Sequence, residues 1–408
     1  MRLFAQNGFQ EGKKIENGIE KKVIDGIIYS PRDVTYTKLV ERLKELKKRF
    51  NYIEALFDPQ FYGCFFAGAE DAKLGNLLSD YDGYFQPRRR NALEREKQVE
   101  EDLYATMKFQ KSLPELSAVI APNIYIPRTL NSIEAVIAKN FIRLARGVYS
   151  KLKDKRPLYV TLALSREALM NSEELLEFLN EITLIDEPPD GFYLLIGARS
   201  TSYRTDIYNA DVIAGWLLLN YSLSINGYKV INGFSDIVTP FLGASGAYAG
   251  CTGWWSNLRT FSLERFQYRP SGGRRPVQRY LSTKLLNRIT FSELNQINSI
   301  GIDVLNGLSS DAYYLKTDDL DEDKIPESNQ EIEQSWEALK ELNNSLFNMK
   351  SKVPEKLKSC LLALDSADDL YQKIPLQLDP KSNSEHIEPL QEGIRAFARL
   401  AGINIPKD

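Results

Sequence analysis

Acidic side chains follow several of the short apolar runs in this sequence. Asp33 follows the run at residues 23–30, Asp58 closes the run at 52–59, and Asp236 follows the run at 228–235. Strand-end residues meet at one face in parallel α/β folds, and two carboxylates in different environments can act as acid and base. We therefore predict Asp58, Asp33 and Asp236 as catalytic residues, with Asp58 first. Capping of the next helix is the alternative role of Asp33.

Arginine recurs at the ends of five such runs, which favours an anionic ligand because guanidinium groups hold phosphates and carboxylates with fixed geometry. Pairing with Asp33, Asp58 or Glu167 is the structural alternative for one or two of these arginines. The predicted ligand-binding residues are Arg32, Gln60, Asn123, Arg166, Arg199, Asn232, Gly253, Trp254 and Arg259.

The counts of histidine and cysteine narrow the chemistry. His386 is the one histidine, so histidine-based metal sites and Ser-His-Asp catalysis are not expected. Cys64, Cys251 and Cys360 lie far apart, which argues against disulfides and a structural zinc site. No metal ligands are predicted and no cofactor is specified, although Mg²⁺ on the three aspartates is a candidate.

The elements that must position these residues alternate between apolar runs and amphipathic helical patterns. Continuous apolar strands between helices indicate a parallel sheet covered on both sides. We predict an α/β fold, a (β/α)8-like TIM barrel, with an open doubly wound sheet as the alternative. The eighth strand is placed within residues 274–282. The other expected strands are residues 23–30, 52–59, 116–123, 157–165, 191–198, 228–235 and 247–254.

Two segments exceed a minimal barrel. Residues 63–115 are expected to form a helical insertion after the second of these strands, as a lid or partner surface. Residues 326–408 are expected to form a C-terminal helical unit that follows a barrel domain at 1–325. A protein partner could bind either addition.

The glycine-rich stretch at residues 243–261 is divided by this assignment. Gly243 and Gly246 are expected to end a helix and allow close strand approach, whereas Gly250 and Gly253 could let a ligand approach backbone N–H groups. Trp254 could stack on a base or sugar, with core packing as its alternative.

The charge distribution limits the partner classes. The net charge of -3 gives no overall attraction to nucleic acid or membranes. Two basic loops, at residues 85–91 and 269–279, could still contact a nucleic acid, or could be solvated loops. The N-terminus lacks the apolar run of a signal peptide and no long apolar span follows, so a cytoplasmic, membrane-free protein is expected.

The general plan, a barrel with aspartates and arginines at its strand ends and basic insertions, is similar to that of the tRNA-guanine transglycosylase class of barrels. The zinc-ligand cluster of that class is absent from this sequence. The resemblance therefore implies a fold alone and transfers no residue or activity.

These observations favour an enzyme of hydrolase or glycosyl transferase type, acting on a phosphorylated, nucleotide or nucleic-acid ligand by carboxylate-assisted chemistry. The alternative is a non-catalytic barrel that binds nucleic acid or protein within a larger assembly. A third hypothesis is a glycosidase that uses Asp33 and Asp58, with Trp254 and Trp255 as a sugar platform.

Overall fold

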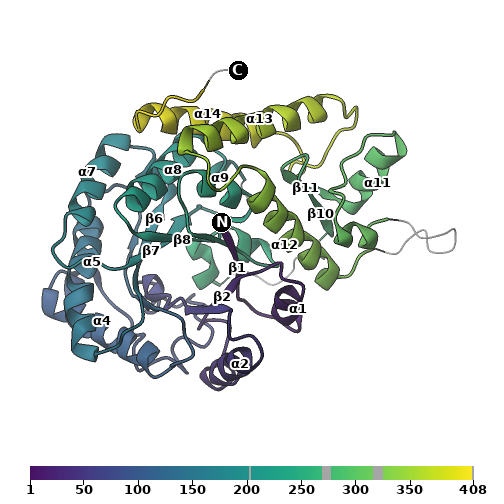
Figure 1. The fold of residues 1–408 in the computed structure, drawn as a ribbon. Helices are drawn as coiled ribbons and strands as arrows, with labels where there is room; N and C mark the ends of the chain where they lie inside the picture. Colours follow the sequence, from purple (N-terminus) through teal and green to yellow (C-terminus); the bar gives the residue numbers. More distant parts are fainter. Residues whose placement is uncertain (202–203, 269–276, 316–324, 407–408) are drawn as a thin grey trace.

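A computed structural model describes residues 1–201, 204–268, 277–315 and 325–406. Its main sheet is a nearly closed barrel of eight parallel strands in the order β3-β2-β1-β9-β8-β7-β6-β4, with β5 paired to β6 (Figure 1). The seam lies between β3 and β4, where Ser117 N donates to Ala55 O at 2.8 Å and Ser117 Oγ accepts from Ala55 N at 3.1 Å. The predicted TIM-barrel fold is confirmed.

Each of the seven expected runs contains one barrel strand, because continuous apolar sequence is buried on both faces of a parallel sheet. The eighth strand differs from the prediction. It is the N-terminal segment, which pairs with β2 on one side and β9 on the other. The strands are β1 (Arg2–Gln6), β2 (Gly26–Tyr29), β3 (Glu54–Phe57), β4 (Val119–Ala121), β5 (Tyr125–Ile126), β6 (Leu158–Ser165), β7 (Gly191–Gly197), β8 (Lys229–Gly233) and β9 (Ala249–Thr252).

Residues 274–282 do not supply the eighth strand. Within them, β10 (Arg279–Ser282) pairs antiparallel with β11 (Asn287–Thr290) in a separate two-stranded sheet. β1 was not recognised in the sequence because only three apolar residues lie between Arg2 and Gln6. Asn7 and Gly8, which are typical of turns, follow directly.

The outer layer of the barrel consists of helices (Figure 1). α12 contacts β1, α1 and α9, so it covers the barrel where a helix connecting β9 to β1 is expected. The longer helices are α1 (Lys14–Glu20), α2 (Tyr36–Arg49), α4 (Glu96–Lys111), α5 (Ile133–Leu152), α7 (Ser172–Thr183), α8 (Ala210–Ile225), α11 (Phe291–Ser299), α12 (Ser328–Ser345), α13 (Val353–Gln372) and α14 (Ile387–Leu400).

Short helical turns occupy many of the connections, including several at strand ends. They are η1 (Phe61–Gly63), α3 (Arg90–Leu93), α6 (Arg166–Leu169), η2 (Arg204–Asp206), η3 (Asp236–Val238), α9 (Thr239–Ala244), α10 (Ser256–Arg259), η4 (Leu263–Phe266) and η5 (Ser309–Tyr313).

The two predicted additions are present as chain segments. Within residues 63–115, α4 packs on α5 and β4 as a member of the helix ring, and turns with the short α3 precede it. In the C-terminal segment, α14 packs along α8 and α13 lies beside α14 (Figure 1). The domain boundary at 325 stays a prediction.

The glycine-rich stretch behaves largely as architecture. Gly246 has φ +102° and lies two residues after the end of α9, so it has the helix-ending role that was predicted. A Cβ on Gly253 would lie 2.6 Å from Leu258 Cβ and 2.8 Å from Gln6 O, so close packing accounts for this glycine. No helix among the described residues is long and apolar enough to cross a membrane.

Candidate functional site

Strand-end side chains gather in two places. The barrel-mouth cluster comprises Gln6, Asp33, Asp58, Tyr62, Tyr193 and Arg265. The second place is a cleft of about 820 Å³ beyond β8 and β9, named here the β8/β9 cleft. It is lined by Thr201, Arg204, Tyr208, Asp236, Ile237, Trp254, Trp255, Ser256, Arg259, Thr260, Val277, Gln278, Arg279, Asn287, Arg288, Ser328, Glu331, Asp379, Pro380 and Lys381.

Asp58 is the buried acid of the barrel mouth, with no exposed surface. Tyr62 donates to its Oδ2 at 2.7 Å, and Tyr193 donates to the same oxygen at 3.3 Å. The backbone N–H of Gln60 donates to Oδ1 at 2.9 Å. Gln60 has φ +53°, a left-handed conformation that brings its N–H back toward the preceding carboxylate.

Burial raises the pKa of Asp58 to about 6, against the opposing effect of the hydrogen bonds from Tyr62 and Gln60. Burial also raises the pKa of Tyr62 and of Tyr193, so both phenols keep their protons and act as donors. Asp58 is therefore a buried carboxyl group with a pKa near 6 within a polar cluster at the barrel mouth.

Asp33 belongs to the same cluster and does not cap α2, which begins at Tyr36 without a side-chain cap. Its Oδ2 accepts from Ser30 Oγ at 2.8 Å and from Arg265 Nη2 at 3.0 Å. Its Oδ1 accepts from Arg32 at 2.8 Å. Asp33 thus ties two arginines to the mouth of the barrel.

The segment after β9 folds back over this cluster. Phe261 O accepts from Ala198 N at 2.9 Å at the end of β7. The Phe261 ring contacts the rings of Tyr62 and Phe234, with centroids 5.1 and 5.5 Å apart. Phe266 packs on Tyr62 at 5.9 Å. These aromatic side chains cover the barrel mouth.

The β8/β9 cleft contains the third predicted aspartate. Asp236 accepts from Arg288 in a two-pronged pair of 2.5 and 2.8 Å, and from Thr252 at 2.7 Å. Burial alone would raise the pKa of Asp236, but Arg288 and Arg259 hold it below its usual range. Asp236 is therefore a carboxylate engaged in an ion pair, located apart from Asp58.

Arg259 lies deep in the same cleft. It donates to Gly253 O at 3.0 Å and Trp254 O at 3.2 Å, and its nearest carboxylate oxygen belongs to Glu331 at 3.4 Å. Burial and the neighbouring Arg288 lower the pKa of Arg259. The two guanidinium groups thus lie in one part of the cleft, each paired with a carboxylate.

Two cations of the β8/β9 cleft have no carboxylate within 4 Å among the described residues. Arg204 donates to Lys381 O at 2.9 Å and to Asn287 Oδ1 at 3.1 Å, and its guanidinium lies 5.1 Å from the Tyr208 ring centroid. The Lys381 side chain is exposed at the rim.

His386, near Arg204, is buried. Burial together with the charge of Arg204 lowers the pKa of His386 to about 3, so this histidine is neutral at pH 7.

The remaining predicted ligand residues are distributed elsewhere. Gln60 is buried and donates to Ser30 Oγ at 2.9 Å. Asn123 donates to Ala138 O at 3.2 Å, toward α5, and Asn232 lies in a network with Asn220 and Trp216 of α8. These three amides make internal hydrogen bonds.

Trp254 donates from Nε1 to Phe9 O at 2.9 Å and lines the β8/β9 cleft. Trp255 lines the same cleft, whereas Asp33 and Asp58 do not. The arrangement that the glycosidase hypothesis needs, with tryptophans beside this aspartate pair, is absent from these lining residues.

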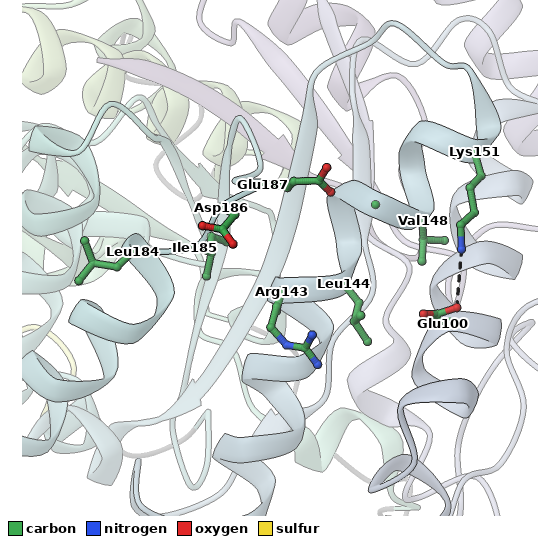
Figure 2. A pocket seen from close by; sticks show the side chains of 10 residues that line it. Glu100, Arg143, Leu144, Val148, Lys151, Leu184, Ile185, Asp186 and Glu187 are labelled. Carbon is green, nitrogen blue, oxygen red and sulfur yellow. Dashed lines mark ion pairs between the residues drawn. The ribbon is translucent and has the colours of Figure 1, made fainter.

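Other hollows surround the barrel. Figure 2 shows one between α4, α5 and residues 184–187, where Lys151 pairs with Glu100 at 3.7 Å. It adjoins the segment that precedes β7, away from the carboxyl ends of the strands. A pocket of about 600 Å³ near the barrel mouth is lined by Tyr62, Phe65, Phe66, Arg89, Arg90, Asn91, Tyr125, Pro127, Glu134 and Leu263.

Neither Mg²⁺ binding nor nucleic-acid binding gains support from side-chain positions. The described residues contain no group of three His, Cys, Asp or Glu side chains placed to hold a metal, and the three cysteines are buried and free. Of the basic loops, residues 85–91 include Arg88, which pairs with Asp102 at 2.6 Å, and most of residues 269–279 lie outside the described residues.

The sequence reasoning missed Arg265, Arg288 and Tyr193. Arg265 and Arg288 lie beyond the last barrel strand, so no strand-end rule pointed to them. Tyr193 lies inside the apolar run of β7. A polar hydroxyl within such a run was the one signal available for it.

Comparisons with known proteins add little. No family model and no curated protein matches the sequence. A solved dihydrodipicolinate synthase from Oceanobacillus iheyensis matches over 97% of this chain and 96% of that chain, at 11% identity and a TM-score of 0.27. A likeness of this size supports no inference about activity.

The predicted hydrolysis or glycosyl transfer on a phosphorylated or nucleotide ligand is wrong. Four strand-end arginines were predicted to bind the ligand beside Asp58, but each forms an ion pair with a different carboxylate, and none of these is Asp58. The pairs are Arg32–Asp33, Arg166–Asp206, Arg199–Glu167 and Arg259–Glu331.

Proposed function

We propose that this TIM barrel binds a small ligand with a phosphate or carboxylate group in the β8/β9 cleft. The observation that carries the proposal is Arg204, a guanidinium in η2 after β7 that lines the cleft and has no carboxylate within 4 Å among the described residues. Its backbone and amide acceptors and the Tyr208 ring hold it in place. An oxyanion is the complementary ligand for such a group.

The remainder of the cleft supports an anion. Its lining contains five cationic side chains and three carboxylates, so positive charge is in excess. Asp236 and Glu331 neutralise Arg288 and Arg259 in part, while Lys381 adds an exposed ammonium at the rim. Trp254 and Trp255 offer an apolar surface to the rest of the ligand.

Calorimetric titration with inorganic phosphate, pyrophosphate and citrate tests this binding. Arg204→Gln removes a charge-assisted hydrogen bond, and we expect roughly tenfold weaker binding of the best ligand. Lys381→Gln should weaken it less, because its side chain is exposed and screened by salt.

Arg143→Gln is the matched control, since Arg143 lines the hollow of Figure 2. Its affinity should equal that of the unmodified protein. Unchanged affinity in Arg204→Gln, or no heat with any of the three anions, would refute the proposal. Binding of an oligonucleotide but of no small anion would favour a nucleic-acid partner instead.

The expected cytoplasmic location stays a prediction. Buried free cysteines are compatible with it.

A further inference from the structure

The barrel mouth contains buried hydrogen-bond donors that have no acceptor. Arg265 uses Nη2 for Asp33, but its Nε and Nη1 have no partner, although the side chain is 2% exposed. Gln6 Nε2 at the end of β1 is also buried and unpartnered. Buried donors in proteins are nearly always paired, so these groups indicate a missing acceptor.

These donors belong to the surroundings of Asp58. Tyr193 OH lies 3.4 Å from Gln6 Oε1 and 3.3 Å from Asp58 Oδ2, which joins Gln6 to the carboxyl group. The positive charge of Arg265 acts on Asp58, Tyr62 and Tyr193 and lowers the pKa of each, against the larger effect of burial. The Arg265 guanidinium and the Asp58 carboxyl group therefore both belong to the barrel-mouth cluster.

The Arg265 guanidinium is fixed in position. Its Cζ lies 5.4 Å from the Phe234 ring centroid and 5.8 Å from that of Phe266, and Asp33 holds Nη2. Two aromatic rings and an ion pair prevent it from turning toward solvent. A rigid, desolvated guanidinium is suited to bind an anion strongly.

The pocket of about 600 Å³ adjoins this cluster. Tyr62 and Leu263 both line that pocket, and Leu263 lies in η4 with Arg265. Tyr62 then donates to Asp58 at 2.7 Å. Asp58 and Gln6 have no exposed surface, so the surroundings of this carboxyl group are enclosed.

We propose that the barrel mouth is a second binding site, distinct from the β8/β9 cleft, in which Arg265 and Gln6 hold a small carboxylate anion beside Asp58. The anion supplies the acceptor that Arg265 Nε and Nη1 and Gln6 Nε2 lack. Protonated Asp58 accommodates the added negative charge, so the site takes up the anion together with a proton.

Titration of the whole protein with formate, acetate and inorganic phosphate at pH 5.5 and pH 8 tests this site. We expect one formate or acetate per chain, bound at least tenfold more tightly at pH 5.5. Arg265→Lys should weaken binding at least tenfold, and Gln6→Leu should weaken it severalfold while leaving the guanidinium in place. Arg146→Lys, on the outer face of α5, is the matched control and should bind normally.

Circular dichroism establishes that each variant is folded, and Gln6→Leu decides the question if Arg265→Lys unfolds. Loss of cleft binding in Arg204→Gln with formate binding retained separates this site from the proposed function. Absence of formate and acetate binding, equal binding by folded variants, or a crystal structure from formate that shows only a water on Arg265 would overturn the proposal. Phosphate binding that depends on Arg265 would assign the site to inorganic oxyanions instead and overturn the carboxylate assignment.

Discussion

Asp58 is a buried acid that accepts hydrogen bonds from two phenols at the barrel mouth. Asp58 was predicted as the first acid, and its burial beside two phenols gives it an unusual environment; its catalytic role stays a prediction. Arg265, which completes that environment, lies some 200 residues further along the chain and follows no strand. Its position depends on the fold of the segment after β9, which sequence periodicity does not encode.

Asp58→Asn tests this environment through stability. The pKa of Asp58 rises from its ordinary 3.8 to about 6 on folding, so its contribution is full below pH 4 and is lost as pH rises through 6. An amide cannot ionise, so the variant should lack this loss, which is about 3 kcal/mol. Urea unfolding at pH 4 to 8 measures how the free energy of unfolding depends on pH in the unmodified protein and in Asp58→Asn. Parallel pH profiles would show that Asp58 titrates normally.

Elements were predicted best where their apolar run was continuous. Seven barrel strands lie in such runs and were found, whereas β1 was missed because its three apolar residues lie between Arg2 and Gln6. β10 was misassigned to the barrel, since the sequence pattern of a short strand is the same in a parallel barrel and in an antiparallel pair. The pairing partner of such a strand depends on contacts distant in sequence.

The ion pair between Arg288 and Asp236 connects β11 to the turn after β8. Arg288→Met removes the partner of Asp236 and leaves a carboxylate in a poorly hydrated position, so we expect about 3–5 kcal/mol lower stability. Adding Asp236→Asn removes that charge and should restore part of the loss. A double-mutant cycle by chemical unfolding measures the coupling. Additive effects would contradict a strong ion pair between these elements.

At the scale of the whole molecule, the barrel and the C-terminal segment together form the β8/β9 cleft. Asp236 and Arg259 come from loops after barrel strands, whereas Arg288, Glu331 and Lys381 come from later in the chain. The sequence predicted the barrel and the helices of its C-terminal segment, but not that the two would share one cleft. That juxtaposition depends on packing such as α12 on β1 and α14 on α8.

The most direct test of the account is a crystal structure grown with tungstate, a phosphate analogue that is located by anomalous scattering. The proposed function predicts a peak in the β8/β9 cleft within hydrogen-bond distance of Arg204, and its loss in Arg204→Gln. An empty cleft at saturating tungstate, or a peak confined to the hollow of Figure 2, would contradict it.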